Sequence, residues 1–110
     1  MSYSIIPTHR FEKELKRLAK KFPSLKNDMV QLIADIVANP QAGTFIGNNC
    51  YKIRLSINSK GKGKSGGARV ITYLYIETKT VYLLTIYDKG EKATLKPKEL
   101  KEIMESLKLD

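Results

Sequence analysis

Residues 69–87 read RVITYLYIETKTVYLLTIY, and this stretch decides the fold. Val, Ile, Tyr and Thr dominate both of its halves, which is the composition of β-strands. The four residues between the halves, ETKT at 77–80, have a length that suits a hairpin. The sequence therefore predicts strands over Arg69–Ile76 and Val81–Tyr87. Because the second run is apolar on both faces, we expect it to lie in the centre of a sheet.

A third strand is predicted upstream of this hairpin. Between Tyr51 and Ile57, aromatic or aliphatic residues alternate with Lys52, Arg54 and Ser56. This two-residue period is typical of a strand that buries one face and exposes the other. The exposed face of this strand would be basic.

Two amphipathic helices are predicted before the strands. Over Thr8–Phe22, apolar residues recur at helical spacing among Lys, Arg and Glu, and the threonine at the start suits an N-cap. Pro23–Ser24 breaks this helix. A second apolar stripe follows over Leu25–Val37 and ends at Asn39–Pro40. The pair predicts a helical hairpin whose apolar faces need a partner.

A short helix closes the chain, with Pro97 in its first turn and an apolar face formed by Leu100, Ile103, Met104 and Leu107. Helices followed by strands favour an α+β fold. We expect an N-terminal helical hairpin packed on a small twisted antiparallel sheet, with the short C-terminal helix added. The 110 residues contain no linker-like stretch, so we expect a single domain over residues 1–110.

The charge of the chain is strongly positive and unevenly distributed. Twenty basic and 11 acidic side chains give a net charge of +9. No acidic side chain occurs between Asp35 and Glu77. Such a surface attracts phosphates, so we favour a nucleic-acid partner over a merely solvated basic face, which normally mixes both signs. Six cations fall in this acid-free window: Lys52, Arg54, Lys60, Lys62, Lys64 and Arg69.

Several other classes of protein are disfavoured by the composition. One cysteine, Cys50, cannot form an internal disulfide, and with the one histidine, His9, it cannot complete a zinc site of four protein ligands. We expect no metal and no cofactor. No apolar run has the length of a signal peptide core or a membrane span. We therefore expect a soluble cytoplasmic protein with no membrane partner.

The loop at 58–67, NSKGKGKSGG, ends like a phosphate-binding P-loop. The first glycine that this motif requires would stand at Asn58, and a strand follows the loop instead of a helix. We therefore reject nucleotide hydrolysis. Two interpretations stay open, a disordered hairpin tip and a basic loop that follows an RNA backbone. In the second, the RNA-binding or ribosome-binding residues are Lys60, Lys62 and Lys64.

Arg69 begins a strand, where its guanidinium could grip one phosphate through two parallel hydrogen bonds. If it converges with Lys52 and Arg54, the three cations could stabilise a phosphorane-like transition state. The chain lacks the carboxylate cluster of a two-metal nuclease. Metal-free RNA cleavage uses the ribose 2′-hydroxyl as nucleophile and needs a base, a charge stabiliser and an acid. The candidates for these roles are Lys52, Arg54, Arg69, Tyr87, Lys89 and Glu91.

The order of these segments resembles the RelE/ParE superfamily of bacterial toxins, and looks most like its HigB-type RelE branch. The resemblance rests on CYKIRL at 50–55, the Lys/Gly-rich loop, GARVITY at 67–73 and YLLTIYDKGE at 82–91. It implies the toxin of a type II toxin–antitoxin system, an endoribonuclease that enters the ribosomal A site and cuts messenger RNA by 2′-hydroxyl attack. It also implies a cognate antitoxin, which we expect to be a helix-turn-helix protein.

The resemblance also implies residue roles. Lys52 and Arg54 match two basic residues on the first long strand, Arg69 matches the arginine that holds the scissile phosphate, and Lys89 matches a basic residue that protonates the leaving group. Well-known members have lysine where this chain has Arg54, which holds its proton too firmly to act as a base. Lys52, Tyr87 or Glu91 could be the base instead. The C-terminal tyrosine of some members has no counterpart over 93–110.

Two other functions compete with messenger cleavage. A ParE-like toxin would share the fold and poison DNA gyrase by binding it, and the matches at Lys52, Arg69 and Lys89 argue against this. A basic protein that binds RNA or the ribosome without catalysis would associate with ribosomes and leave the messenger intact.

Overall fold

The computed structural model describes residues 3–61 and 63–107. Within them a five-stranded sheet has the order β1–β5–β4–β3–β2. The apolar run that the sequence predicted to be central forms β5, which lies between β1 and β4. The strands are β1 (Ser4–Pro7), β2 (Thr44–Phe45), β3 (Cys50–Leu55), β4 (Ala68–Tyr75) and β5 (Thr80–Asp88). The helices are α1 (His9–Lys21), α2 (Leu25–Ala38) and α3 (Pro97–Ser106), and short 3-10 turns are η1 (Asn58–Lys60), η2 (Lys64–Gly66) and η3 (Ile76–Thr78).

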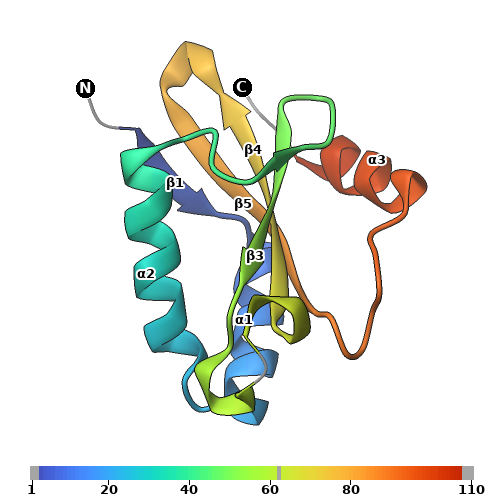
Figure 1. Cartoon of the computed structure of the whole chain (residues 1–110). Coiled ribbons are helices and arrows are strands. Elements are labelled where there is room, and N and C mark those ends of the chain that lie inside the picture. Colours follow the sequence, from blue (N-terminus) through green and yellow to red (C-terminus); the bar gives the residue numbers. More distant parts are fainter. Residues whose placement is uncertain (1–2, 62, 108–110) are drawn as a thin grey trace.

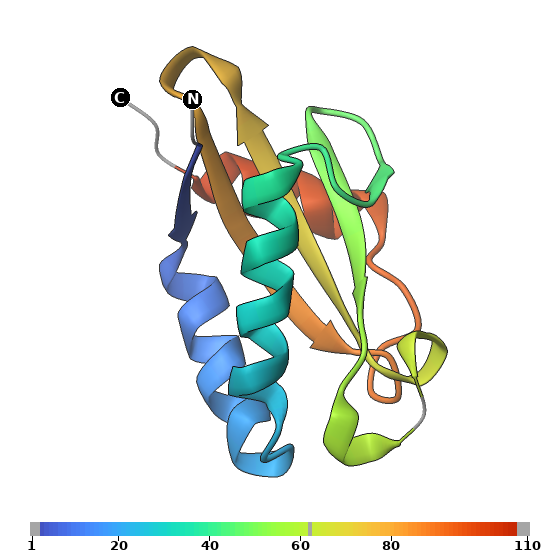
Figure 2. The same cartoon turned by 60° about the vertical axis from the view of Figure 1, so that its left-hand side comes forward.

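Helices cover both faces of the sheet. The hairpin of α1 and α2 lies against one face and α3 lies against the other (Figures 1 and 2). The larger apolar core, which includes Phe11, Leu32 and Val70, fills the space on the hairpin side. A smaller core that includes Ile71 and Leu100 lies under α3. None of the helices in the described part of the chain has the length and apolar character needed to cross a membrane.

The α+β class, the helical hairpin and the C-terminal helix are confirmed. The predicted N-cap is also confirmed, because the Thr8 hydroxyl accepts a hydrogen bond from the Phe11 N–H at 3.2 Å. The strand predicted to reach Ile57 ends at Leu55, where the chain turns into η1. Ile57 nevertheless stays fully buried in the larger core.

The sheet is mixed, whereas the sequence predicted an antiparallel one. The strand β1 was not predicted, and it pairs in parallel with β5. Four residues are too few to show a two-residue period, and the proline at the end of β1 is tolerated only because the strand lies at an edge. The pairings of β2 with β3, β3 with β4 and β4 with β5 are all antiparallel.

One extra residue interrupts the pairing of β5 with β4. The pairs Ile71–Thr85 and Thr72–Leu83 follow each other, so Leu84 has no partner on β4. Such a bulge shifts the alternation of side chains by one residue. Tyr82 and Tyr87 consequently both belong to the α3 side of the sheet, although they lie five positions apart, an odd spacing that would place them on opposite faces of a regular strand.

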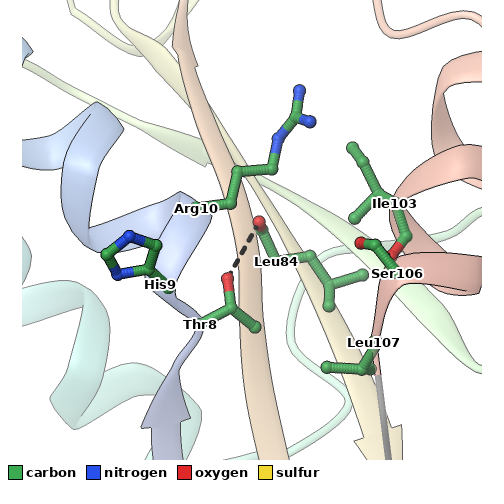
Figure 3. A pocket seen from close by; sticks show the side chains of 7 residues that line it. All are labelled: Thr8, His9, Arg10, Leu84, Ile103, Ser106 and Leu107. Atoms are coloured by element: carbon green, nitrogen blue, oxygen red, sulfur yellow. Dashed lines mark hydrogen bonds between the residues drawn. The ribbon is translucent and has the colours of Figure 1, made fainter.

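The start of α1 satisfies the backbone groups at this bulge. The Thr8 hydroxyl donates to the Leu83 and Leu84 carbonyls at 2.9 and 3.2 Å, and Figure 3 shows the second of these bonds. The Glu14 carboxylate accepts from the Thr85 hydroxyl at 2.6 Å and from the Ile86 N–H at 3.3 Å. An unpaired backbone group buried in a sheet is costly, so these contacts hold the bulge in place.

We expect Glu14→Ala to lower the free energy of unfolding by about 2 kcal/mol, because it leaves a buried N–H and a buried hydroxyl without an acceptor. Urea unfolding followed by circular dichroism measures the change. Glu12→Ala is the matched control, since Glu12 lies exposed on the same helix. Equal losses in the two variants would contradict the assigned role of Glu14.

Candidate functional site

Three candidate residues form a row across neighbouring strands. Arg54 on β3 pairs with Arg69 on β4, and Arg69 pairs with Tyr87 on β5. Paired residues on adjacent strands place their side chains on the same face. Tyr87 belongs to the core under α3, so the row lies on the sheet face opposite the α1–α2 hairpin. Lys52 lies on the same face, two residues before Arg54.

A glycine permits this register. A Cβ atom on Gly67 would lie 2.0 Å from the Leu55 carbonyl oxygen, so only glycine lets the start of β4 come this close to the end of β3. The Gly67 carbonyl also accepts from the Lys89 N–H at 3.0 Å, which ties the end of β5 to the same point. The row is thus anchored at the end of three strands.

Arg69 is a buried cation without an acidic partner. Its side chain is about 5% exposed, and its Nη1 donates to the carbonyls of Lys64 and Ala68 at 2.9 and 3.0 Å. Among the described residues no carboxylate lies within ion-pair distance of it. Like charges directly across a strand pair are unfavourable, and Arg54 supplies such a charge. The arrangement is therefore suited to an external anion.

Tyr87 brings a neutral hydrogen-bond donor to the row. It is buried, and its hydroxyl has no well-formed hydrogen bond within the described chain. Burial raises the pKa of the Tyr87 hydroxyl, while the positive charge of Arg69 and the nearby backbone of Leu95 act in the opposite direction. The phenol therefore stays protonated at neutral pH and can donate its proton in a hydrogen bond.

The turn after β5 carries the last two candidates, and they point to different partners. The Lys89 ammonium donates to the Ala93 carbonyl at 2.8 Å and is half-buried. The Glu91 carboxylate is turned to α1, where it pairs with Arg17 at 3.1 Å and Lys21 at 3.6 Å. The hydrogen bond from Arg17 is the main reason why the pKa of Glu91 is lowered. Glu91 is therefore not brought to the row, and its catalytic role stays a prediction.

The lysine-rich loop is tied to the fold at its first turn. The Lys60 ammonium pairs with the buried Asp88 carboxylate at 2.7 Å and is only 14% exposed. The buried Asp28 carboxylate accepts from the Asn58 backbone and side chain at 3.2 and 2.8 Å. Lys64 is exposed, and Lys62 lies outside the described residues. The RNA contacts of these three lysines stay predictions.

A comparison with known protein families shows which family this chain belongs to. Residues 10–108 match the family described as the RelE toxin of the RelE/RelB toxin–antitoxin system.

The chain belongs to the RelE toxin family.

Solved RelE structures share the fold. A double arginine-to-alanine variant of the Escherichia coli toxin RelE in the free state is 17% identical, with a TM-score of 0.65 over 98% of this chain and 100% of that one. The RelE chain of the intact Escherichia coli RelBE complex is 19% identical, with a TM-score of 0.59 over 78% and 95%. A chain of the RelBE2 toxin–antitoxin complex of Mycobacterium tuberculosis is 15% identical, with a TM-score of 0.58 over 80% of this chain and 99% of that one. The RelE/ParE resemblance is confirmed, and the HigB-type branch stays a prediction.

The sequence reasoning missed one lysine that the RelE fold brings to the row. The Lys92 ammonium lies 5.8 Å from the centre of the Tyr87 ring and also pairs with Glu99 on α3. Three residues after Lys89, it is one of several lysines in a charged stretch, so no periodic pattern distinguishes it. Among the described residues, no three His, Cys, Asp or Glu side chains gather as a metal site.

Asp88 makes the stability of the fold depend on pH. Burial would raise the pKa of the Asp88 carboxyl, but hydrogen bonds from the Lys60 ammonium and the Gly90 N–H hold it below its ordinary value. A carboxyl whose pKa is lower in the folded state stabilises the fold above its unfolded pKa of about 3.9. This stabilisation is lost as the pH falls through the lower folded pKa.

We expect Asp88→Asn to lower the free energy of unfolding by about 2 kcal/mol at neutral pH, because Lys60 loses its charged acceptor. The difference from wild type should shrink as the pH falls below the unfolded pKa of about 3.9, because the wild-type carboxyl takes up a proton at its lowered folded pKa. Urea titrations across this range measure it. Glu77→Gln is the control, since Glu77 is exposed. A difference that does not change with pH would contradict the role of the Asp88 charge.

Proposed function

We propose that this RelE-family chain is a ribosome-dependent endoribonuclease that cuts messenger RNA in the ribosomal A site without a metal ion. The observation that carries this proposal is Arg69, a buried cation with no carboxylate partner among the described residues, set between Arg54 and Tyr87. A buried charge of this kind is unfavourable unless an anion completes it. A scissile phosphate is such an anion, and the family membership supports this assignment.

In the proposed reaction, the ribose 2′-oxygen loses its proton, attacks the adjacent phosphorus and displaces the 5′-oxygen of the next nucleotide. Arg69 and Arg54 hold the phosphate and stabilise the charge that develops on its oxygens. The protonated Tyr87 hydroxyl donates a hydrogen bond to the same group. Lys52, on the same face as the row, is the base that we favour, and Lys89 supplies the proton to the leaving oxygen.

The ribosome completes the site by orienting the messenger. A small open surface binds one extended RNA strand weakly, so a bound ribosome would supply much of the alignment. We propose that the exposed Lys64 contacts ribosomal RNA, while Lys60 keeps its ion pair with Asp88. We include Lys62 in this contact on sequence grounds. The activity would take place in the cytoplasm.

We further propose that a cognate antitoxin of the helix-turn-helix class binds and inactivates the chain. Similar folds occur in RelBE toxin–antitoxin complexes of two bacteria. A chain with a net charge of +9 also favours an acidic or amphipathic partner segment. Co-expression with a neighbouring gene product, followed by purification of a stable complex, tests this partner.

Primer extension on a defined messenger held on ribosomes tests the catalytic proposal. We expect cleavage at the A-site codon by the wild type, and none without ribosomes. Arg69→Ala should slow cleavage by about 10²- to 10³-fold, because it removes a contact to the charge that develops in the transition state. Arg54→Ala should also slow it, and because Arg54 is exposed this variant keeps its fold.

Lys13→Ala is the matched control, since it removes one exposed positive charge from α1 on the other side of the sheet and should leave cleavage unchanged. Circular dichroism verifies that all variants are folded. Full cleavage by both arginine variants would overturn the phosphate role. An intact messenger with folded wild type on ribosomes would refute the nuclease and favour passive ribosome binding, or gyrase poisoning if DNA damage signalling appears.

A further inference from the structure

A cavity of about 190 Å³ lies between β3, the β2–β3 loop and the start of α3. Figure 1 shows these three elements together, with the connection from β5 rising beside the sheet to α3. The apolar lining of the cavity comes from Ile46, Ile71, Leu95 and Leu100, together with Pro97 at the first turn of α3. Two polar side chains, Asn48 and Lys52, complete the wall.

The size and lining of this cavity fit one aromatic heterocycle. Engineered apolar cavities of about 150 Å³ bind benzene, so this space can hold a nucleobase ring. A typical ligand site combines apolar walls with a few polar groups that fix orientation. The Asn48 amide offers one acceptor and two donors, and among the described residues it has no hydrogen-bond partner. It can therefore pair with the edge of a base.

The position of the cavity connects it to the row of Arg54, Arg69 and Tyr87. Lys52 lines the cavity and lies on the same strand face as Arg54, two residues away. This spacing along a strand, about 6.6 Å, brings the two cations close enough to serve neighbouring groups of one RNA strand. No carboxylate lines the cavity, so a phosphate attached to the bound nucleotide meets no like charge there.

Two other cavities fit this ligand less well. The cavity in Figure 3 lies beside Thr8, Leu84 and the last turn of α3, and Lys52, Arg54, Arg69 and Tyr87 do not line it. The cavity between α2 and β3 is lined by Arg54, but also by Asp28 and Asp35. Two carboxylates would repel the phosphates of an RNA strand.

We propose that the cavity between the β2–β3 loop and α3 is a subsite for one unpaired nucleobase of the RNA, next to the phosphate held by Arg54 and Arg69. This inference rests on the proposed endoribonuclease function. Sequence-specific recognition of RNA commonly uses splayed-out bases held in pockets and read on their edges. The cavity reads the base through Asn48 and gives the reaction its base preference, while the arginine row grips the backbone regardless of sequence.

The test uses ribosomes programmed with messengers that carry each of the four bases at each position of the A-site codon. Primer extension gives the ratio of fastest to slowest cleavage at every position. We expect the wild type to prefer one base at one position, and Asn48→Gly to reduce that ratio about tenfold. Ile46→Trp, which fills the cavity from the half-buried loop, should reduce it as well.

Asn49→Gly is the matched control. Asn48 and Asn49 are adjacent and exposed, and both have positive φ angles of 52° and 59°, so glycine relieves the same backbone strain at each. Only Asn48 lines this cavity. Identical preference profiles for wild type, Asn48→Gly and Asn49→Gly would overturn the inference while the proposed nuclease stands.

If the folded wild type does not cleave, the proposed nuclease fails, and a binding measurement decides on the cavity alone. Nucleoside monophosphates are then titrated into the purified chain, and the methyl resonances of Ile71 and Leu100 are followed by NMR. Shifts with a nucleoside monophosphate, but not with inorganic phosphate, would support a base in the cavity. Equal responses to the two ligands would overturn it.

Discussion

The bulge at Leu84 is the constraint on which the arrangement of the sheet face with Arg54, Arg69 and Tyr87 depends. With uninterrupted pairing, Tyr82 and Tyr87 would point to opposite faces of β5, because side chains alternate along a strand. The extra residue lets the first half of β5 bury Val81 and Leu83 under the helical hairpin and still places Tyr87 under α3. Thr8 and Glu14 stabilise the bulge from α1. The start of one helix thus helps decide what faces the opposite side of the sheet.

Several acidic side chains of the described residues are engaged with partners other than the arginine row. Glu14 is used at the bulge, Asp28 holds the turn after β3, and Asp88 and Glu91 bind cations from the loop and α1. Arg69 therefore keeps its positive charge unneutralised by the described residues, beside a second arginine. This distribution stabilises the fold through local ion pairs and leaves the opposite face prepared for an anion. The acidic residues therefore contribute to the stability of the fold, whereas Arg69 serves the proposed chemistry.

The comparisons show that this fold tolerates extensive change in sequence. Solved RelE chains with 15–19% identity still align over most of their lengths. What such chains need in common is the apolar pattern of helices and strands, because this pattern buries the cores on both sides of the sheet. The proposed division of labour fits this freedom. A phosphate grip on paired strands depends on register alone, whereas base preference can vary with a few cavity-lining side chains such as Asn48.

The sequence by itself determined the helical hairpin, the three longer strands, the C-terminal helix and the concentration of positive charge, because periodicity and charge are local properties of the chain. It also placed Arg54 and Arg69 on strands and identified Tyr87 as a candidate. The parallel strand β1, the bulge, the engagement of Lys60 with Asp88 and the approach of Lys92 to Tyr87 were decided only by the tertiary structure. The first three join segments far apart in sequence or depend on a one-residue shift in pairing, and the approach of Lys92 to Tyr87 depends on how the turn after β5 folds back towards α3. Such features follow from how whole elements pack, and no local pattern encodes them.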